Sequence, residues 1–340
     1  MIWKKDFMRQ ISYSDAIREA LTEELRRDED VFLMGEDIGA YGGAFGVTRG
    51  LIDEFGAERV MDTPISEGTT AGAAIGAALE GRRPVVEFMF MDFIALAADQ
   101  LLNQAAKLRY VFGEQASCPL VIRTPTGGGR CYGPTHSQSL EAWFVHVPGL
   151  KVIAPATPYD AKSLLKTAVR DPDPVLFLEH KMLYKQQGQV ADDDEHDDCR
   201  GILPLGEARI AREGQDITIV AWSGMTREAE KAAEELEKSD VEAEVVDMRT
   251  LSPMDTETLL ASVRKTGCVL IVQEAPRTGG VGGEISARIS ENIYEYLDAP
   301  VRRLASPDVP FPASPVLEER MIPDKNRIVE VAVEMLEEGI

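Results

Sequence analysis

The sequence predicts an α/β protein with two open, mostly parallel sheets that helices cover on both faces. Short apolar runs alternate with stretches of helical periodicity along the chain, and this rhythm is typical of parallel sheets. With 340 residues, the chain is longer than one ordinary domain. The alternation lapses once, in a polar and acidic stretch, so we expect a first domain over 1–190, a linker over 191–204 and a second domain over 205–340.

The first half opens with a helix over 14–27, which Ser14 is expected to cap because its hydroxyl can accept a hydrogen bond from the first turn. Apolar runs predict strands at 30–37, 59–67, 83–90, 119–125, 151–156 and 174–180. Helical periodicity predicts helices at 68–81, 93–112 and 159–171. The Gly and Ala positions of 68–81 suit a helix that packs very closely on its neighbour.

After the acidic stretch, the same alternation starts again. Strands are expected at 217–224, 243–251 and 268–275, and helices at 228–238, 255–263 and 282–297. The second half is therefore predicted to be another, smaller open α/β domain.

Charge and composition exclude several classes of function. The net charge of −22 argues against nucleic acid as a partner, because a phosphate backbone is bound by accumulated Lys and Arg. No apolar run reaches the roughly 18 residues that a membrane-spanning helix needs. The chain starts with a short charged lead and no apolar signal-peptide core, so we expect a cytoplasmic protein. The four cysteines lack CxxC spacing, which argues against a zinc site or a disulfide framework.

Glu67 is the first candidate for chemistry. It follows an expected strand and precedes the Ala/Gly-rich helix, where open α/β sheets bind ligands beyond the carboxyl ends of their strands. Apolar surroundings would raise its pKa and make it a proton-sharing group. The alternative is a helix N-terminal acid that only gains from the helix dipole.

His136 is the second candidate, in the segment GGGRCYGPTHSQS. Glycines let the backbone approach a ligand closely, and a histidine among small polar groups can transfer protons near neutral pH. Gly127 to Gly129 lack the Lys and Ser/Thr of a phosphate-binding loop, so a nucleotide site is not supported. The alternative is a surface loop with an incidental histidine.

Six segments carry a resemblance over nearly the whole chain. They are MGEDIGAYGGAFGVTRGL, DTPISE, EFMFMDF, THSQSLEAWFVHVPGLKVIAPATPYDAKSLL, AVRDPDPVLFLEHKMLY and DMRTLSPMD. In this order, they resemble the beta subunits of the pyruvate, acetoin and branched-chain 2-oxo acid dehydrogenase family, which belong to the thiamine-diphosphate-dependent first component of these complexes. The resemblance implies a transketolase-like pyrimidine-binding domain followed by a transketolase C-terminal-like domain.

By this resemblance, Glu67 hydrogen-bonds the aminopyrimidine ring of thiamine diphosphate and drives it to the imino tautomer, and Phe93 packs on the pyrimidine. Glu36, Ile65 and Met89 match positions that line the same pocket. His136 matches the histidine near the reacting carbon that takes part in reductive acylation of the lipoyl group. A structural monovalent cation, usually potassium, is also implied. Its ligands match Leu120, Ala168, Val169, Asp171 and Asp173.

The family's diphosphate-binding members hold magnesium with a GDG segment and a later Asn, and neither occurs here. The resemblance therefore implies that Mg²⁺ and the diphosphate are held by a separate alpha subunit. We expect a heterotetramer of two alpha and two beta chains, which passes an acyl group to the lipoyl acyltransferase component.

The segments HSQSLEAWF and LEHKMLY favour a 2-oxo acid such as pyruvate, or acetoin, as substrate. Two alternatives stay open, a branched-chain 2-oxo acid dehydrogenase beta subunit and a non-catalytic scaffold subunit of the same fold. A one-chain thiamine enzyme would require a longer chain that includes the GDG segment.

Overall fold

The computed structural model describes residues 8–191 and 202–338, and contacts between residues divide it into two compact units. Unit 1 consists of Met1–Pro125 and His146–Leu205, and unit 2 of Thr126–Val145 and Gly206–Ile340. Residues 192–201, most of the expected linker, lie outside the described residues. The sequence placed 126–145 in the domain over 1–190, whereas the contacts group this segment with unit 2.

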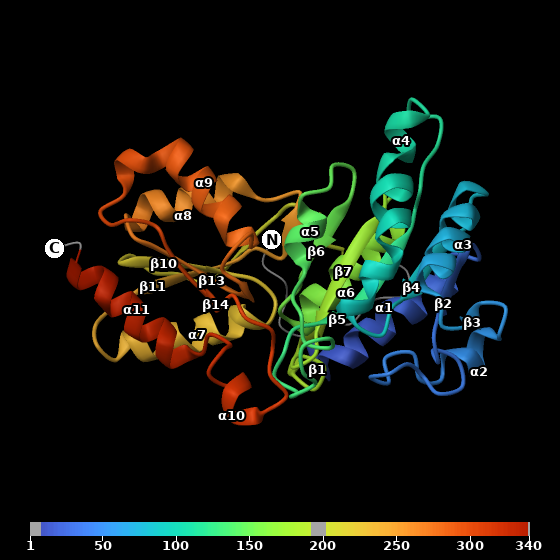
Figure 1. Cartoon of the computed structure of the whole chain (residues 1–340), viewed down its shortest axis with the longest axis horizontal. Coiled ribbons are helices and arrows are strands. Elements are labelled where there is room, and N and C mark those ends of the chain that lie inside the picture. The colour runs from blue at the N-terminus through green and yellow to red at the C-terminus, as the bar shows by residue number, and fades with distance from the viewer. Residues whose placement is uncertain (1–7, 192–201, 339–340) are drawn as a thin grey trace. The chain divides into compact units, whose positions relative to one another are not determined.

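Unit 1 is built on a sheet of short, buried strands (Figure 1). Its strands are, in spatial order, β6 (Lys151–Ile153), β7 (Val175–His180), β5 (Val121–Thr126), β4 (Arg83–Glu87), β2 (Val31–Gly35) and β3 (Val60–Asp62). The pairs β2/β3, β2/β4, β4/β5 and β6/β7 are parallel, as the sequence predicted. Because neighbouring strands run the same way, their carboxyl ends meet at one edge of the sheet.

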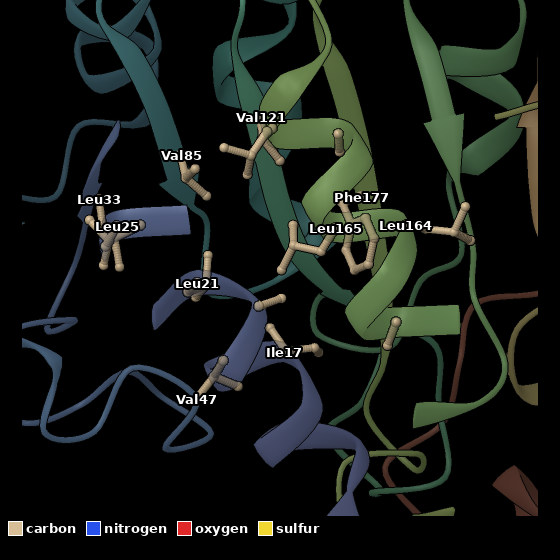
Figure 2. Packing of buried hydrophobic residues seen from close by; sticks show 14 of the residues in the cluster. Ile17, Leu21, Leu25, Leu33, Val47, Val85, Val121, Leu164, Leu165 and Phe177 are labelled. Carbon is tan, nitrogen blue, oxygen red and sulfur yellow. The ribbon is translucent and has the colours of Figure 1, made fainter. Parts of the chain in front are cut away.

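Helices α1 (Tyr13–Arg27) and α6 (Pro158–Arg170) pack together and cover the core of unit 1. Figure 2 shows Ile17 and Leu21 of α1 and Leu165 of α6 in the same buried cluster as Phe177 of β7. The predicted cap of α1 was wrong by two residues. Ser12 is the N-cap, and its hydroxyl accepts a hydrogen bond from the Asp15 amide at 3.1 Å.

The helix begins early because the chain enters it from a strand that the sequence pattern did not show. Strand β1 (Met8–Ser12) pairs antiparallel with β8 (Gln187–Ala191), and the Tyr13 amide still donates to the Gln186 carbonyl at 2.8 Å. Tyr13 is buried, so the first helical residue is fixed by packing. Unit 1 also contains α2 (Leu51–Phe55) and α3 (Glu67–Leu79), and α3 packs on β4.

The regular helix expected over 93–112 was wrong. The segment consists of the 3₁₀ helix η2 (Met91–Ala97), the π-helix η3 (Gln100–Gln104), the 3₁₀ helix η4 (Ala105–Lys107) and α4 (Leu108–Val111). Met91, Ile94 and Ala97 are buried at a spacing of three, which is the period of a 3₁₀ helix. Burial of this stripe overrides the regular helical period.

Unit 2 is a second open sheet. Its strands are, in spatial order, β14 (Arg302–Ser306), β13 (Val269–Pro276), β10 (Ile217–Ala221), β11 (Ala243–Asp247) and β9 (Arg209–Arg212). The pairs β14/β13, β13/β10 and β10/β11 are parallel, whereas β9 is an antiparallel edge strand. The strands β9 and β14 were not among the predicted elements.

Helices cover both faces of this sheet. In Figure 1, α8 (Thr256–Thr266) and α9 (Val281–Ile293) lie on one face, and α7 (Gly224–Glu237) and α11 (Lys325–Glu338) lie on the other. The remaining elements of unit 2 are α5 (Glu141–Val145), β12 (Thr250–Ser252), η5 (Tyr294–Tyr296) and α10 (Pro315–Glu318). Over the described ranges 8–191 and 202–338, no helix is long and apolar enough to cross a membrane.

Candidate active site

Glu67 lies at the carboxyl edge of the unit 1 sheet, where the sequence placed it. It is the first residue of α3, and its side chain is only 6% exposed. The preceding strand ends earlier than predicted, at Asp62, so a short loop separates it from Glu67. Glu67 therefore begins the helix that follows the strand, at the carboxyl edge of the sheet.

Glu36 lies close enough to Glu67 for the two carboxylates to affect one another. It directly follows β2, the parallel neighbour of β3. Partial burial raises the pKa of Glu36, and the negative charges of Glu67 and Asp37 raise it further. This sheet edge therefore holds a group of carboxyls, at least one of which retains its proton more strongly than in water.

The other three cofactor-binding candidates follow the same group of strands. Ile65 lies between β3 and α3 and is 83% exposed, whereas Met89 and Phe93, which follow β4, are half-buried. The structure therefore brings Glu36, Ile65, Glu67, Met89 and Phe93 to the ends of three neighbouring strands, β3, β2 and β4. A buried acid next to partly open apolar side chains can bind a flat ring that carries a polar edge.

Phe93 lies at the end of a row of aromatic rings. Its ring packs edge to face on Phe90, with centroids 5.6 Å apart, and Phe90 packs the same way on Phe45 at 5.7 Å. Phe45 stacks on Tyr184 at 5.1 Å, and the Lys181 ammonium lies 5.3 Å from the Phe90 centroid. These contacts restrict the orientations open to Phe90 and thus to Phe93.

His136 lies in unit 2, in the glycine-rich loop between β5 and α5. Its side chain is half-buried, and its Nδ1 lies 3.0 Å from the Thr135 hydroxyl. A pocket of about 440 Å³ opens beside the loop. Its lining residues are Pro134, Gln138, Ser139, Leu140, Pro276, Thr278, Asp308, Val309, Pro310 and Phe311. Glu67 and His136 belong to different units.

Comparison with known proteins assigns both units to families. Residues 9–187 match the transketolase pyrimidine binding domain, and residues 206–328 match the transketolase C-terminal domain. A solved chain described as a split gene transketolase, an inactive beta4 tetramer, has the same fold, with a TM-score of 0.77 at 24% identity. The match covers 96% of this chain and 98% of that one.

Known proteins with similar sequences identify the family more narrowly, since they are beta subunits of dehydrogenases. A 2-oxoisovalerate dehydrogenase subunit beta of Bacillus subtilis is 48% identical, over 97% of this chain and 100% of the relative. A pyruvate dehydrogenase E1 component subunit beta of Rhizobium meliloti is 46% identical, over 95% and 69%. The beta subunit of acetoin:2,6-dichlorophenolindophenol oxidoreductase of B. subtilis is 44% identical, over 97% and 98%.

The chain belongs to the E1 beta-subunit family. This confirms the family, the two transketolase-like α/β domains and the class of oxidoreductase subunit that the sequence predicted.

In this E1 beta-family chain, the five candidate ligands of a monovalent cation lie near the C-terminus of α6. The carbonyls of Leu120, Ala168 and Val169 each accept one hydrogen bond, from Val175, Asp171 and Arg83 respectively. The Lys151 ammonium lies 2.6 Å from Asp171 and 3.3 Å from Asp173, so both carboxylates already have a cationic partner. A further cation would have to share these carbonyl and carboxylate oxygens with the groups that they already contact. In the described part of the chain, no group of three or more His, Cys, Asp or Glu could hold a metal ion.

A buried ionic network in unit 1 was missed by the sequence analysis. Arg123 of β5 contacts Glu179 of β7 at 2.7 Å and Glu87 of β4 at 2.8 Å, and Tyr184 donates to Glu179 at 2.9 Å. Burial raises the pKa of Glu87 and of Tyr184. Glu87, Arg123 and Glu179 each lie within a strand whose residues are mostly buried, and these opposite charges in buried strands were the available signal.

Proposed function

We propose that this chain provides the pyrimidine-binding half of a thiamine-diphosphate site in the E1 enzyme of a 2-oxo acid or acetoin dehydrogenase complex. The observation that carries the proposal is the position of Glu67, a buried carboxylate at the carboxyl edge of the sheet, next to Glu36 with its raised pKa. The exposed Ile65 and half-buried Phe93 at the same edge leave apolar surface that a pyrimidine ring would cover.

Glu67 would hold a proton at the ring nitrogen of the bound pyrimidine. The charge of Glu67 helps to raise the pKa of the neighbouring Glu36, because ionising both brings like charges together. The cofactor, when bound, supplies the carbon nucleophile that attacks the substrate carbonyl. Glu36 and Met89 would line the ring pocket, and Phe93 would pack on the ring, with Phe90 limiting its rotation.

His136 would act at the later step, in which the acyl group passes to a lipoyl arm. A protonated imidazole side chain can donate a proton to a dithiolane sulfur. Its place in a loop beside an open pocket supports this role, since a swinging arm needs access from solvent.

The diphosphate and Mg²⁺ would be held by an alpha subunit, because the GDG segment is missing from this sequence. A relative is named as the beta subunit of an E1 component, which supports an alpha partner. The assembly would contain two alpha and two beta chains and would act on a lipoyl acyltransferase. A monovalent cation such as K⁺ would bind through the carbonyls of Leu120, Ala168, Val169, Asp171 and Asp173. Cytoplasmic residence stays a prediction.

Identity to the curated relatives does not single out a substrate, since pyruvate, acetoin and 2-oxoisovalerate enzymes match at 44–48%. Pyruvate or acetoin is our first proposal, and a branched-chain 2-oxo acid is the second because the relative at 48% acts on 2-oxoisovalerate by name. The test is thiamine-dependent turnover of the reconstituted alpha and beta pair on these three compounds. No turnover on any of them by an assembled pair would support the scaffold alternative.

A further inference from the structure

Two buried carboxylates of unit 2 hold the backbone of the glycine-rich loop that contains His136. The Gly128 amide donates to Oε1 of Glu274, in β13, and the Cys131 amide donates to Oε2 of Glu318, in α10, at 2.7 Å. Glu274 and Glu318 are only 5% and 2% exposed. A carboxylate that has lost its water holds such an amide strongly, because a charge-assisted hydrogen bond is roughly twice as strong as a neutral one.

The loop is also packed tightly at Gly128. A Cβ added there would lie 2.8 Å from the Phe311 ring, 3.0 Å from Ile322 Cδ1 and 3.1 Å from Oε1 of Glu318. Oε1 of Glu318 has no hydrogen-bond partner among the described residues. The loop therefore has little room to move toward α10.

The contacts of Gly128 and Cys131 hold the first half of the loop. Two further hydrogen bonds close the base of the loop, where its two ends meet. The Gly127 amide and the Thr126 hydroxyl both donate to the Gln138 carbonyl, each at 3.3 Å. His136 lies between the base at Gln138 and the held amide of Cys131. Its own amide donates to the Gly133 carbonyl at 3.4 Å, so the hairpin-like loop sets its position.

We propose that Glu274 and Glu318 are positioning residues that hold this loop in the conformation presenting His136 for acyl transfer. The proposal rests on the proposed function of His136. Neither glutamate was singled out from the sequence, because both become relevant only when β13 and α10 fold against the loop.

The experiment compares Glu318→Ala, Glu318→Gln and Glu274→Gln in the assembled alpha and beta enzyme. Glu319→Gln is the matched control, since Glu319 is the exposed neighbour of Glu318. Acylation of a lipoylated acceptor should fall roughly ten- to a hundredfold in Glu318→Ala, as is typical when a catalytic group shifts by about 1 Å. Glu318→Gln keeps an acceptor oxygen and should recover part of the rate. Reduction of an artificial electron acceptor should stay near the wild-type rate.

A double variant separates positioning from a general structural effect. In a His136→Ala background, Glu318→Ala should cause no further loss of lipoyl acylation, because both changes act through one group. A further loss of the same size, or an equal fall of both activities in Glu318→Ala alone, would overturn the proposal.

Hydrogen exchange over residues 127–136 of the same assembled enzyme gives a readout that does not depend on catalysis. Exchange at the Gly128 and Cys131 amides should speed up in the Glu274 and Glu318 variants, respectively, and stay unchanged in Glu319→Gln. If His136→Ala does not alter lipoyl acylation, the function proposed for His136 fails, whereas unchanged exchange in the glutamate variants refutes the holding contacts themselves.

Discussion

Arg123 and Glu179 form a bidentate ion pair in the interior of unit 1. The guanidinium Nε lies 2.7 Å from Oε1, and Nη2 lies 3.0 Å from Oε2. Both side chains are buried, and Glu87 lies on the other side of Arg123. Arg123 thereby links β4, β5 and β7 just beneath the sheet edge that holds Glu67. Its single positive charge offsets part of the free-energy cost of burying two carboxylates.

Replacing Arg123 with Met should destabilise the chain strongly. The change leaves Glu87 and Glu179 buried without their cation, and breaking a buried pair in this way typically costs about 3–5 kcal/mol. Urea unfolding of the isolated chain would measure the loss. Arg26→Met is the matched control, since its pair with Glu54 at 2.6 Å is exposed and should contribute less than about 1 kcal/mol. Similar losses in the two variants would contradict the role given to the network.

This network also shows where reasoning from the sequence ends. The strands were predictable because apolar runs mark them, and Glu67 was found because strand and helix patterns meet beside it. Arg123 and its partners are 36 and 56 residues apart, and only the strand order β7-β5-β4 brings them together. The Ser12 cap and the 3₁₀ segment after β4 depend on burial in the same way, so local propensity could not give them.

The stability of the chain should depend on pH through Glu36. Its pKa is raised by burial and by the charges of Glu67 and Asp37, so the folded state binds the proton more tightly than the unfolded state does. The stability gained from this proton is complete at low pH and is lost as pH rises through the raised pKa. Glu36→Gln should therefore stabilise the chain, and the gain should grow between about pH 4 and pH 7.

Thermal unfolding of the wild-type chain and of Glu36→Gln across this pH range would measure the effect. Glu58→Gln, at an exposed position, serves as control. A gain that shrinks with rising pH would mean that Glu36 is stabilised as an anion.

Glu67→Gln should abolish cofactor activation while leaving the fold intact. Gln keeps the shape of the side chain but cannot share the proton with the pyrimidine nitrogen, a loss that typically costs about 10²- to 10⁴-fold in rate. Turnover of the assembled enzyme and circular dichroism of the chain are the two measurements. Glu80→Gln, at the exposed opposite end of α3, serves as control. Near-normal turnover would show that another group is the acid.

The small-residue helix α3 should be part of an interface in the assembled enzyme. Gly76 is exposed, and a Cβ added there would meet nothing within 4 Å. Gly76→Ala should stabilise the isolated chain by about 0.5–1 kcal/mol, as in any helix interior. Gly76→Leu should leave the isolated chain folded but weaken assembly, because a bulky side chain prevents close backbone approach. Native mass spectrometry of each variant mixed with the alpha chain would measure assembly. Unchanged assembly of Gly76→Leu would show that this face of α3 is not part of an interface.

His136→Ala should separate the two half-reactions. If His136 passes a proton to the lipoyl sulfur, lipoyl-dependent turnover should fall about 10²- to 10⁴-fold, whereas decarboxylation followed with an artificial electron acceptor should change far less, because that acceptor bypasses the arm. Both rates are measured on one assembled preparation, so that a folding defect lowers them together. Thr135→Val provides a second variant, since the Thr135 hydroxyl lies 3.0 Å from Nδ1 of His136. Without this hydrogen bond to orient the ring, lipoyl acylation should slow while the dye-linked rate is kept. An equal fall of both activities in His136→Ala, with assembly intact, would place His136 at or before decarboxylation.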